Sequence, residues 1–390
     1  MAWNWPFARR GRIAVPERKD ASPGFVALHA QGEASWTRRD FPALARAGYM
    51  RNPVAHRSVR LVCEAAAGMK WTLRQGEDEL HEHPLLDLLA TPNQRQPGNA
   101  FMEALYGYML MSGNAYVELV EAGPDMRELH LLRPDRVSVV ADAAGWPVAL
   151  DYGTGRTKRR VPLRGEDATG ALHLRMFHPL DDHYGFPPLE AALTALDLHH
   201  AAARWNKALL DNSARPSGAL VYAPKDGANL TDDQFQRLKS ELEEGYTGAT
   251  RAGRPMLLEG GLDWKAMGLT PKDMDFVEAR NAASRDIALA CGVPPMMLGI
   301  QGDNTYSNYQ EANRAFYRLT VLPLVARIAG ELSGWLGPVF GEDLRLDFDT
   351  DQIEGLAFER NLIWSRVESA SFLSEDEKRE AVGYAPRNVE

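Results

Sequence analysis

Apolar residues recur every three or four positions in five long stretches of the chain, the spacing that places them on one face of an α-helix. The predicted helices span about 52–68, 98–113, 189–212, 270–290 and 307–335. Glycine ends the first, second and fourth of these stretches, and proline opens the third, as is usual at helix ends. Shorter helical patterns lie at 83–89, 231–244, 353–370 and 374–382.

The last long helix contains a proline. Ser307 and Gln310 give it a capping-box start, and its apolar stripe continues to Trp335. Pro323 removes a backbone hydrogen bond, at a cost of about 3 kcal/mol, so we predict a kink there. We expect the helix to end at Gly337 and Pro338. The polar loop before this helix follows Gly292, Pro294 and Pro295, which stop the preceding one.

Short runs with period-two alternation predict strands, most of them in the first half of the chain. They lie at 71–73, 115–120, 128–132, 137–141 and 148–152, and later at 218–222, 255–259 and 344–348. Two of the later runs lie at 213–267, together with a polar helix, between two long helices. We therefore predict an α+β fold in which a small α/β unit is inserted between two helices that pack together.

Composition narrows the class of protein. The chain has 390 residues, a net charge of −9 and two cysteines, Cys63 and Cys291, far apart in sequence. This composition favours a globular, soluble protein made inside the cell, without a disulfide framework or a membrane partner. Net charge is about +7 over residues 1–60 and about −7 over 338–390. One interpretation is that the chain has a basic and an acidic surface that bind different partners. The other is that these charges lie on solvated faces and only balance each other.

Motifs for nucleotide binding and covalent catalysis are incomplete. Gly248 to Gly253 has phosphate-loop spacing but is followed by Arg254 and Pro255, not lysine and a hydroxyl residue. Gly153 and Gly155 lack the strand and helix of a dinucleotide site. Neither a Gly-x-Ser-x-Gly elbow nor a cysteine with a catalytic signature is present. We expect no enzymatic activity and no cofactor.

Several histidines lie close together in sequence and could in principle be ligands of a metal ion. His173, His178 and His183 recur every five residues across Pro179, and this spacing gives no common face for tetrahedral zinc. The adjacent His199 and His200 are better explained as residues on a helix face. Asp347, Asp349 and Asp351 lack the glycine and glutamate of a calcium loop. We therefore predict no metal site.

An ordered set of short motifs extends from about residue 50 to the C-terminus. Its members are Asn52-Pro-Val, His83-Pro-Leu-Leu-Asp-Leu-Leu, Pro92-Asn93, Gly113-Asn-Ala-Tyr, Gly185-Phe-Pro-Pro-Leu, Phe276-Val-Glu-Ala-Arg, Gly292-Val-Pro-Pro, Leu298-Gly299, Thr305-Tyr-Ser-Asn, Thr320-Val-Leu-Pro and Leu373-Ser-Glu-Asp-Glu-Lys-Arg-Glu. The set resembles the portal proteins of tailed bacteriophages, in the short form without a long C-terminal barrel. It is also similar to the portals of alphaproteobacterial gene transfer agents. Met1 to Gly24 and Thr154 to Ala171 match none of these motifs.

The resemblance implies a portal fold with wing, two-helix stem, inserted clip, kinked tunnel helix and short helical crown. Its expected parts are a mobile arm (1–24), wing (25–185), first stem helix (186–212), clip (213–267), second stem helix (268–292), tunnel loop region (293–307), kinked tunnel helix (308–337), wing strand (338–352) and crown (353–390). The residues expected to line the DNA channel are Ile300, Gln301, Gly302, Asp303, Asn304, Thr305 and Tyr306.

The resemblance also implies a function. We expect a homo-oligomeric ring, a dodecamer, that conducts double-stranded DNA at the portal vertex of a virion or phage-like particle assembled in the bacterial cytoplasm. A terminase motor and a head-tail adaptor would dock on the clip, and the major capsid protein on the wing. Two alternatives stay open: a metal-dependent cytoplasmic hydrolase using the histidines at 173–200, and a small DNA-binding module using the arginine-rich arm.

Overall fold

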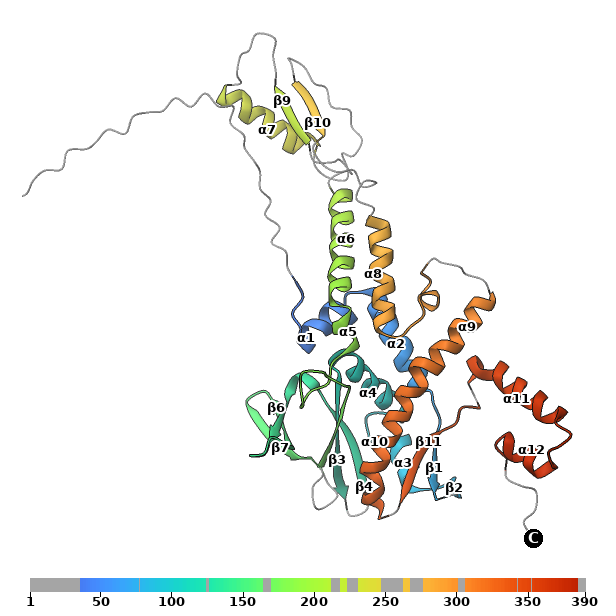
Figure 1. Ribbon diagram of the computed structural model, residues 1–390. Helices are drawn as coiled ribbons and strands as arrows, with labels where there is room; N and C mark the ends of the chain where they lie inside the picture. The colour runs from blue at the N-terminus through green and yellow to red at the C-terminus, as the bar shows by residue number, and fades with distance from the viewer. Residues whose placement is uncertain are drawn as a thin grey trace, which may run out of the picture. The chain divides into compact units, whose positions relative to one another are not determined.

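The computed structural model describes residues 36–76, 78–123, 126–163, 170–211, 218–222, 231–246, 262–266, 276–300, 306–341, 343–351 and 353–384. Thr37–Glu390 forms one compact unit of the chain. The predicted arm, 1–24, and the first residues of the predicted wing, to residue 35, lie outside the described residues. The fold is α+β, as predicted, with helices and antiparallel sheets that are labelled in Figure 1.

Two three-stranded antiparallel sheets form the first half of the unit. In one, β3 (Asn114–Gly123) lies between β4 (Met126–Leu132) and β8 (Gly170–Arg175). In the other, β6 (Pro147–Thr154) lies between β5 (Val137–Ala141) and β7 (Thr157–Pro162). A small core joins them, made of Tyr116, Leu132, Val137, Leu150, Val161 and Ala171. Strand β7 and the first two residues of β8 fall in the region that matched no motif, and neither strand was predicted from period-two alternation.

An ion pair also joins these two sheets. Arg159 of β7 donates through both terminal guanidinium nitrogens to the carboxylate of Glu118 on β3, one bond measuring 2.6 Å. Glu118 is only 5% exposed. The neighbour of Arg159 in the same strand, Arg160, pairs instead with Asp151 in solvent, at 2.8 Å. The charged sequence of β7 is therefore explained by partners on other strands, which a search for apolar alternation cannot detect.

A third sheet pairs strands that lie far apart in the sequence, before residue 81 and after residue 343. β1 (Trp71–Gln75) pairs with β2 (Asp78–Leu80) on one side and with β11 (Leu344–Phe348) on the other. Helices α2 (Pro53–Ala67), α3 (Pro84–Ala90) and α4 (Gly98–Ser112) share with it the main core, which also takes in the long C-terminal helix. The predicted helices at 52–68, 83–89 and 98–113 and the strand at 344–348 are confirmed.

The Gly113-Asn-Ala-Tyr and Gly185-Phe-Pro-Pro motifs meet in space. Gly113 has φ of +72°, and a Cβ atom on it would lie 2.4 Å from the carbonyl oxygen of Gly185. The Asn114 carboxamide accepts from the Gly185 amide at 2.8 Å and donates to the carbonyl of Ser112 at 2.7 Å. It also accepts from the His173 ring, which stacks on Tyr116. Two segments 71 residues apart are thus fixed by backbone contact and one buried amide.

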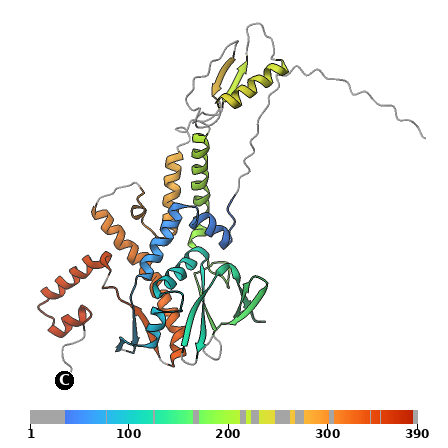
Figure 2. The same cartoon turned by 180° about the vertical axis from the view of Figure 1, so that it is seen from behind.

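Two long helices follow. Helix α5 (Pro188–Ala191) is separated from α6 (Leu193–Asp211) by a break at Ala192, so the single predicted helix 189–212 is corrected to two. Helix α8 (Phe276–Ala290) packs beside α6, as both views show (Figures 1 and 2). The predicted start of α8 at Thr270 lies outside the described residues.

Part of the predicted inserted unit is described. It contains β9 (Gly218–Tyr222), paired antiparallel with β10 (Leu262–Ala266), and helix α7 (Asp232–Tyr246). Strand β9 and the helix were predicted. Strand β10 was not predicted, and the strand predicted at 255–259 lies outside the described residues.

The long C-terminal helix changes its hydrogen-bond pattern next to the proline. It consists of α9 (Tyr306–Phe316), a π-helical turn η5 (Tyr317–Val321) and α10 (Leu322–Phe340). Within this turn the Leu322 amide donates to the Tyr317 carbonyl, five residues back. Pro323, which has no amide hydrogen, lies directly after the turn, in the first turn of α10. The kink itself stays a prediction.

The C-terminal boundary of this helix differs from the prediction. Helix α10 continues through Gly337 and Pro338 to Phe340 and ends at Gly341, which has φ of +73°. The span Ser307–Phe340 is long and apolar enough to cross a membrane, by length and composition alone. The apolar side of α10 is instead buried in the main core, through Val325, Ile328, Leu332 and Leu336.

Two helices end the described chain, α11 (Ala357–Ser369) and α12 (Glu375–Ala381), which we call the C-terminal hairpin. Ser374 caps α12, since its hydroxyl accepts from the Glu377 amide while the Glu377 carboxylate accepts from the Ser374 amide. The Trp364 and Tyr384 rings meet edge to face at 5.9 Å. Both predicted helices are confirmed, whereas the division into wing, stem, clip and crown stays a prediction.

Candidate functional site

The paired helices α6 and α8 are tied to α2 through one histidine. His199 of α6 is 2% exposed, and its two ring nitrogens lie 3.3 Å from Asn52 Nδ2 and 3.2 Å from Arg280 Nε. Asn52 caps α2, its Oδ1 accepting from the amides of Val54 and Ala55. The orientation of this side-chain amide is therefore fixed, and Nδ2 faces the histidine as a donor.

His199 is thus held between two donors. Neutral imidazole accepts through one ring nitrogen only, and imidazolium accepts through neither. Burial lowers the pKa of His199, and the charges of Arg280 and His200 lower it further. Asn52 and Arg280 are both residues of the motifs that carry the family resemblance. Their contact through His199 was not predicted, because a contact between three separate helices has no local sequence signal.

The first described residues are also attached to α6. Thr37 donates through its amide to Asp197 Oδ2 at 3.0 Å and through its hydroxyl to Asp197 Oδ1 at 2.6 Å. Helix η1 (Ala45–Tyr49), a π-helical turn that follows α1 (Phe41–Leu44), approaches α5 so closely that a Cβ atom on Gly48 would lie 2.7 Å from the Leu189 side chain. The start of the described chain is therefore packed against α5 and α6.

A tight turn connects α8 with the predicted channel loop. Gly292 has φ of +67°, as expected for a left-handed cap, and its carbonyl accepts from the Thr320 hydroxyl at 2.6 Å. A Cβ atom on Gly292 would lie 2.5 Å from that hydroxyl oxygen, so only glycine fits. Helix η4 (Pro295–Leu298) follows and ends at Gly299, with φ of +71°. The turn is thereby held against η5, the π-helical turn of the long helix.

The predicted channel residues are only partly described. Ile300 is half-buried, and its amide donates to the Pro295 carbonyl at 3.3 Å. Gln301, Gly302, Asp303, Asn304 and Thr305 lie outside the described residues. Tyr306 begins α9, and only its backbone is described. Both ends of the predicted loop are therefore fixed by helical segments that pack on the main core, Met297 and Leu298 before it and Phe316 after it.

The histidines of the metal hypothesis occupy separate environments. His173 lies in β8 and donates to Asn114, and burial with the charge of Arg175 lowers its pKa to about 4. His178 and His183 lie in the loop after β8, and His200 lies on α6. Within the described residues, no group of three or more histidine, cysteine, aspartate or glutamate side chains is arranged to hold a metal ion.

Similarity to known proteins extends over most of the chain. The family model described as "Phage portal protein" matches residues 53–383. The chain belongs to the phage portal protein family. A chain in a structure titled "Neck of empty GTA particle computed with C6 symmetry" is 50% identical, with a TM-score of 0.73, covering 91% of this portal and 96% of that chain.

Two further proteins are similar over most of the chain. A chain in "Neck of native GTA particle computed with C12 symmetry" is 49% identical, with a TM-score of 0.71 and coverage of 92% and 97% of the two chains. A Rickettsia bellii (strain RML369-C) protein described as "Uncharacterized protein" is 41% identical over 86% of this portal and 87% of its own length. The portal resemblance drawn from the ordered motifs is confirmed, and head-tail connection is the function of the family.

Proposed function

We propose that this portal protein assembles as a ring of twelve copies at one vertex of a virion or phage-like particle. The ring would surround the channel through which double-stranded DNA is packaged and ejected. The observation that supports this most strongly is the 49–50% identity, over more than nine tenths of the chain, to chains in necks of gene transfer agent particles analysed with C6 and C12 symmetry. The same relatives favour a gene transfer agent as the particle.

The chemistry of the chain suits conduction of DNA. Each phosphate neutralised by lysine or arginine adds salt-dependent affinity, so a strongly basic channel would retain the DNA it has to pass. This chain has a net charge of −9, and of the residues from Ile300 to Tyr306 only Asp303 is charged. In our proposal these seven residues line the channel at its constriction, contacting phosphates without strong retention.

The proposed partners follow the predicted domains. Because the sequence has no complete phosphate-binding loop, the ATP-driven terminase motor is a separate polypeptide. In our proposal the motor and the head-tail adaptor dock on the clip, 213–267, and the major capsid protein contacts the wing. The portal itself acts as a non-enzymatic channel and docking platform.

The mass of the purified protein tests the proposal. Mass photometry with negative-stain imaging is expected to show a ring with a central channel and a mass of about twelve copies. A monomer with steep salt-dependent DNA affinity would support the basic-arm module instead, and a stoichiometric bound metal would support the hydrolase. Either result, without rings, would overturn the proposal.

Two further experiments test the proposed contacts. An Asn304→Cys variant carrying a photoactivatable cross-linker is expected to attach to DNA in filled particles, whereas the same change at Trp146, an exposed residue between β5 and β6, is not. Deletion of 213–267 is expected to abolish terminase binding. Cross-links only at Trp146, or terminase binding that survives the deletion, would contradict the respective assignment.

A further inference from the structure

The loop between β8 and α5, residues 176–187, exposes two large apolar side chains. Phe177 is 80% exposed and Leu180 is 92% exposed, among the highest values for large apolar residues in the described part of the chain. A single exposed apolar side chain is common on a protein surface. Two of them within four residues of one loop form a patch, and such patches commonly mark contacts with another macromolecule.

Hydrogen bonds fix the conformation of this loop. The Leu180 amide donates to His178 Nδ1 at 3.0 Å. The Asp181 carboxylate accepts from the amides of His183 and Tyr184 at 2.8 and 2.9 Å. The Tyr184 hydroxyl in turn accepts from the Val139 amide of β5 at 3.0 Å. A loop ordered in advance loses little conformational entropy on binding, so the patch is suited to a specific contact.

Charged residues anchor and border the same loop. The Arg175 guanidinium donates to the Asp182 carbonyl, and the Arg327 guanidinium of α10 donates to the Arg175 carbonyl. The Asp182 side chain is exposed, and its carboxylate forms no ion pair among the described residues. We call Phe177, Leu180 and Asp182 the acidic patch.

A second patch has the opposite charge. Met50, at the end of η1, is 73% exposed and is accompanied by the exposed arginines Arg46 and Arg51. The backbone beneath them is fixed, because the Met50 amide donates to the Ala45 carbonyl at 2.9 Å and Gly48 is buried against α5. We call Arg46, Met50 and Arg51 the basic patch.

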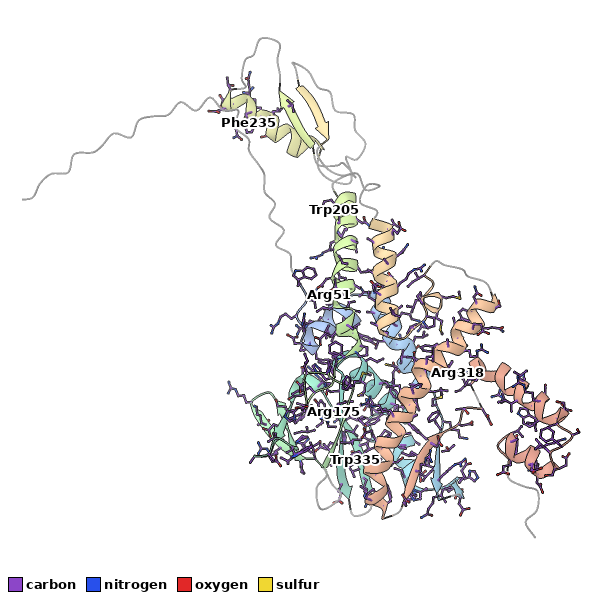
Figure 3. All side chains as sticks on the ribbon, viewed as in Figure 1. Arg51, Arg175, Trp205, Phe235, Arg318 and Trp335 are labelled. Carbon is purple, nitrogen blue, oxygen red and sulfur yellow. The ribbon has the colours of Figure 1, made fainter. Side chains whose placement is uncertain are left out.

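The two patches belong to different parts of the chain, the basic patch to η1 and the residues just after it and the acidic patch to the loop between β8 and α5. Figure 1 shows α10, which anchors the loop of the acidic patch, in front of α2, and Figure 2 shows α1 and α2 in front when the unit is seen from behind. Figure 3 labels Arg51 and Arg175, which mark the two regions. Two separate surfaces are what a cyclic ring needs, because each copy contacts its two neighbours through two different surfaces.

We infer that the acidic patch of one copy docks on the basic patch of the next copy in the ring. Phe177 and Leu180 pack against Met50, whose flexible thioether accommodates an aromatic ring. Asp182 pairs with the guanidinium groups of Arg46 and Arg51, a charge-assisted contact that fixes orientation. The inference rests on the proposed function, since it requires a ring of identical copies.

Charge exchange tests this contact. We expect Asp182→Arg alone, and Arg46→Asp with Arg51→Asp, to raise the protein concentration needed for half-maximal ring formation at least about tenfold, measured by mass photometry. The variant that combines all three changes is expected to recover ring formation. Leu180→Ser with Phe177→Ser should weaken assembly similarly, whereas Trp146→Ser, which removes an exposed apolar side chain elsewhere, should not. Thermal unfolding of the monomers verifies that each variant folds.

Disulfide trapping provides a second measurement. Leu180→Cys combined with Met50→Cys is expected to give covalent multimers on mild oxidation, and Trp146→Cys combined with Met50→Cys only monomers. The native cysteines, Cys63 and Cys291, are buried and do not interfere. If the wild-type protein forms rings but neither the charge exchange nor the trapping behaves as expected, this contact is wrong and the ring stands. Absence of wild-type rings overturns both.

Discussion

The strands of the first half bury their apolar side chains, whereas the C-terminal hairpin leaves several of its own exposed to solvent. Tyr116 and Leu129 on the strands are at most 1% exposed, whereas Leu362, Ile363 and Phe372 of the hairpin region are 42%, 47% and 85% exposed. The strands also bury polar groups that are fully paired, such as Asn114. The strand region is therefore stabilised by cores within the chain, whereas we expect the hairpin surface to be completed by neighbours.

The largest effect is expected where two backbones touch. Gly113→Ala places a methyl group against the Gly185 carbonyl in a backbone conformation that disfavours side chains, so we expect a loss of more than about 3 kcal/mol in the free energy of unfolding, or no folded protein. Gly145→Ala is the matched control, since Gly145 has φ of +89° and nothing within 4 Å of its Cβ position. It should cost about 1 kcal/mol. Equal urea midpoints for the two variants would contradict the argument.

The next effect concerns the ion pair between the two sheets. Arg159→Met leaves the buried Glu118 carboxylate unpaired, and we expect a loss of about 3 kcal/mol in urea unfolding. Arg160→Met, the adjacent change on the same strand, breaks a solvent-exposed pair with Asp151 and should cost under about 1 kcal/mol. If Glu118→Gln restores no stability to Arg159→Met, an unpaired buried charge is not the cause.

Lowering the pH should reduce the free energy of unfolding through a histidine in the same region. A histidine with a lowered pKa in the folded state binds its proton mainly after unfolding, so stability is full above the unfolded pKa, about 6.5, and is lost as pH falls toward about 4. His173, which contacts Asn114 and Tyr116 and is influenced by the charges of Arg175 and His183, should contribute up to about 3 kcal/mol to this loss. We expect His173→Gln to flatten the dependence of the urea midpoint on pH between about 7 and about 4.5. An unchanged slope would remove His173 as the cause.

The smallest effect is expected in the hairpin. Ile363→Ser should change the unfolding free energy of the monomer by no more than about 0.5 kcal/mol, because the side chain is already half in solvent. Leu129→Ser, at a buried position of β4, is the control and should cost at least about 2 kcal/mol. Similar melting temperatures for the two variants would erase the distinction between the regions.

The helices and several strands could be predicted because apolar periodicity reports the face that each element buries. The α2 cap at Asn52, the turn at Gly113 and the left-handed Gly292 each had a local sequence signal. Strands β7 and β10 did not, since their residues are largely charged or mixed and their pairing is set by partners elsewhere. The family, by contrast, followed from the order of weak motifs.

The segments that flank the predicted channel loop were predicted, whereas Gln301 to Thr305 lie outside the described residues and their role in a channel stays a prediction. The turn at Gly292 and the helix that follows the channel loop lie where the sequence placed them. The contact of His199 with Asn52 and Arg280 could not be foreseen, because it depends on three helices meeting. The π-helical turn was also missed, since a hydrogen bond to the fifth residue back has no side-chain signature.

The π-helical turn η5 changes the direction in which the side chains that follow it point. One additional residue in a turn rotates everything after it by about 100° relative to an uninterrupted α-helix. Tyr317, at the start of the turn, packs on the main core and also lies against Gly355 next to the hairpin, while Val325 and Ile328 beyond the turn are buried in the same core. The additional residue thereby keeps the apolar side chains before and after the turn on the same core, and deleting one residue between Tyr317 and Val321 would rotate one of these two stripes by about 100° away from it.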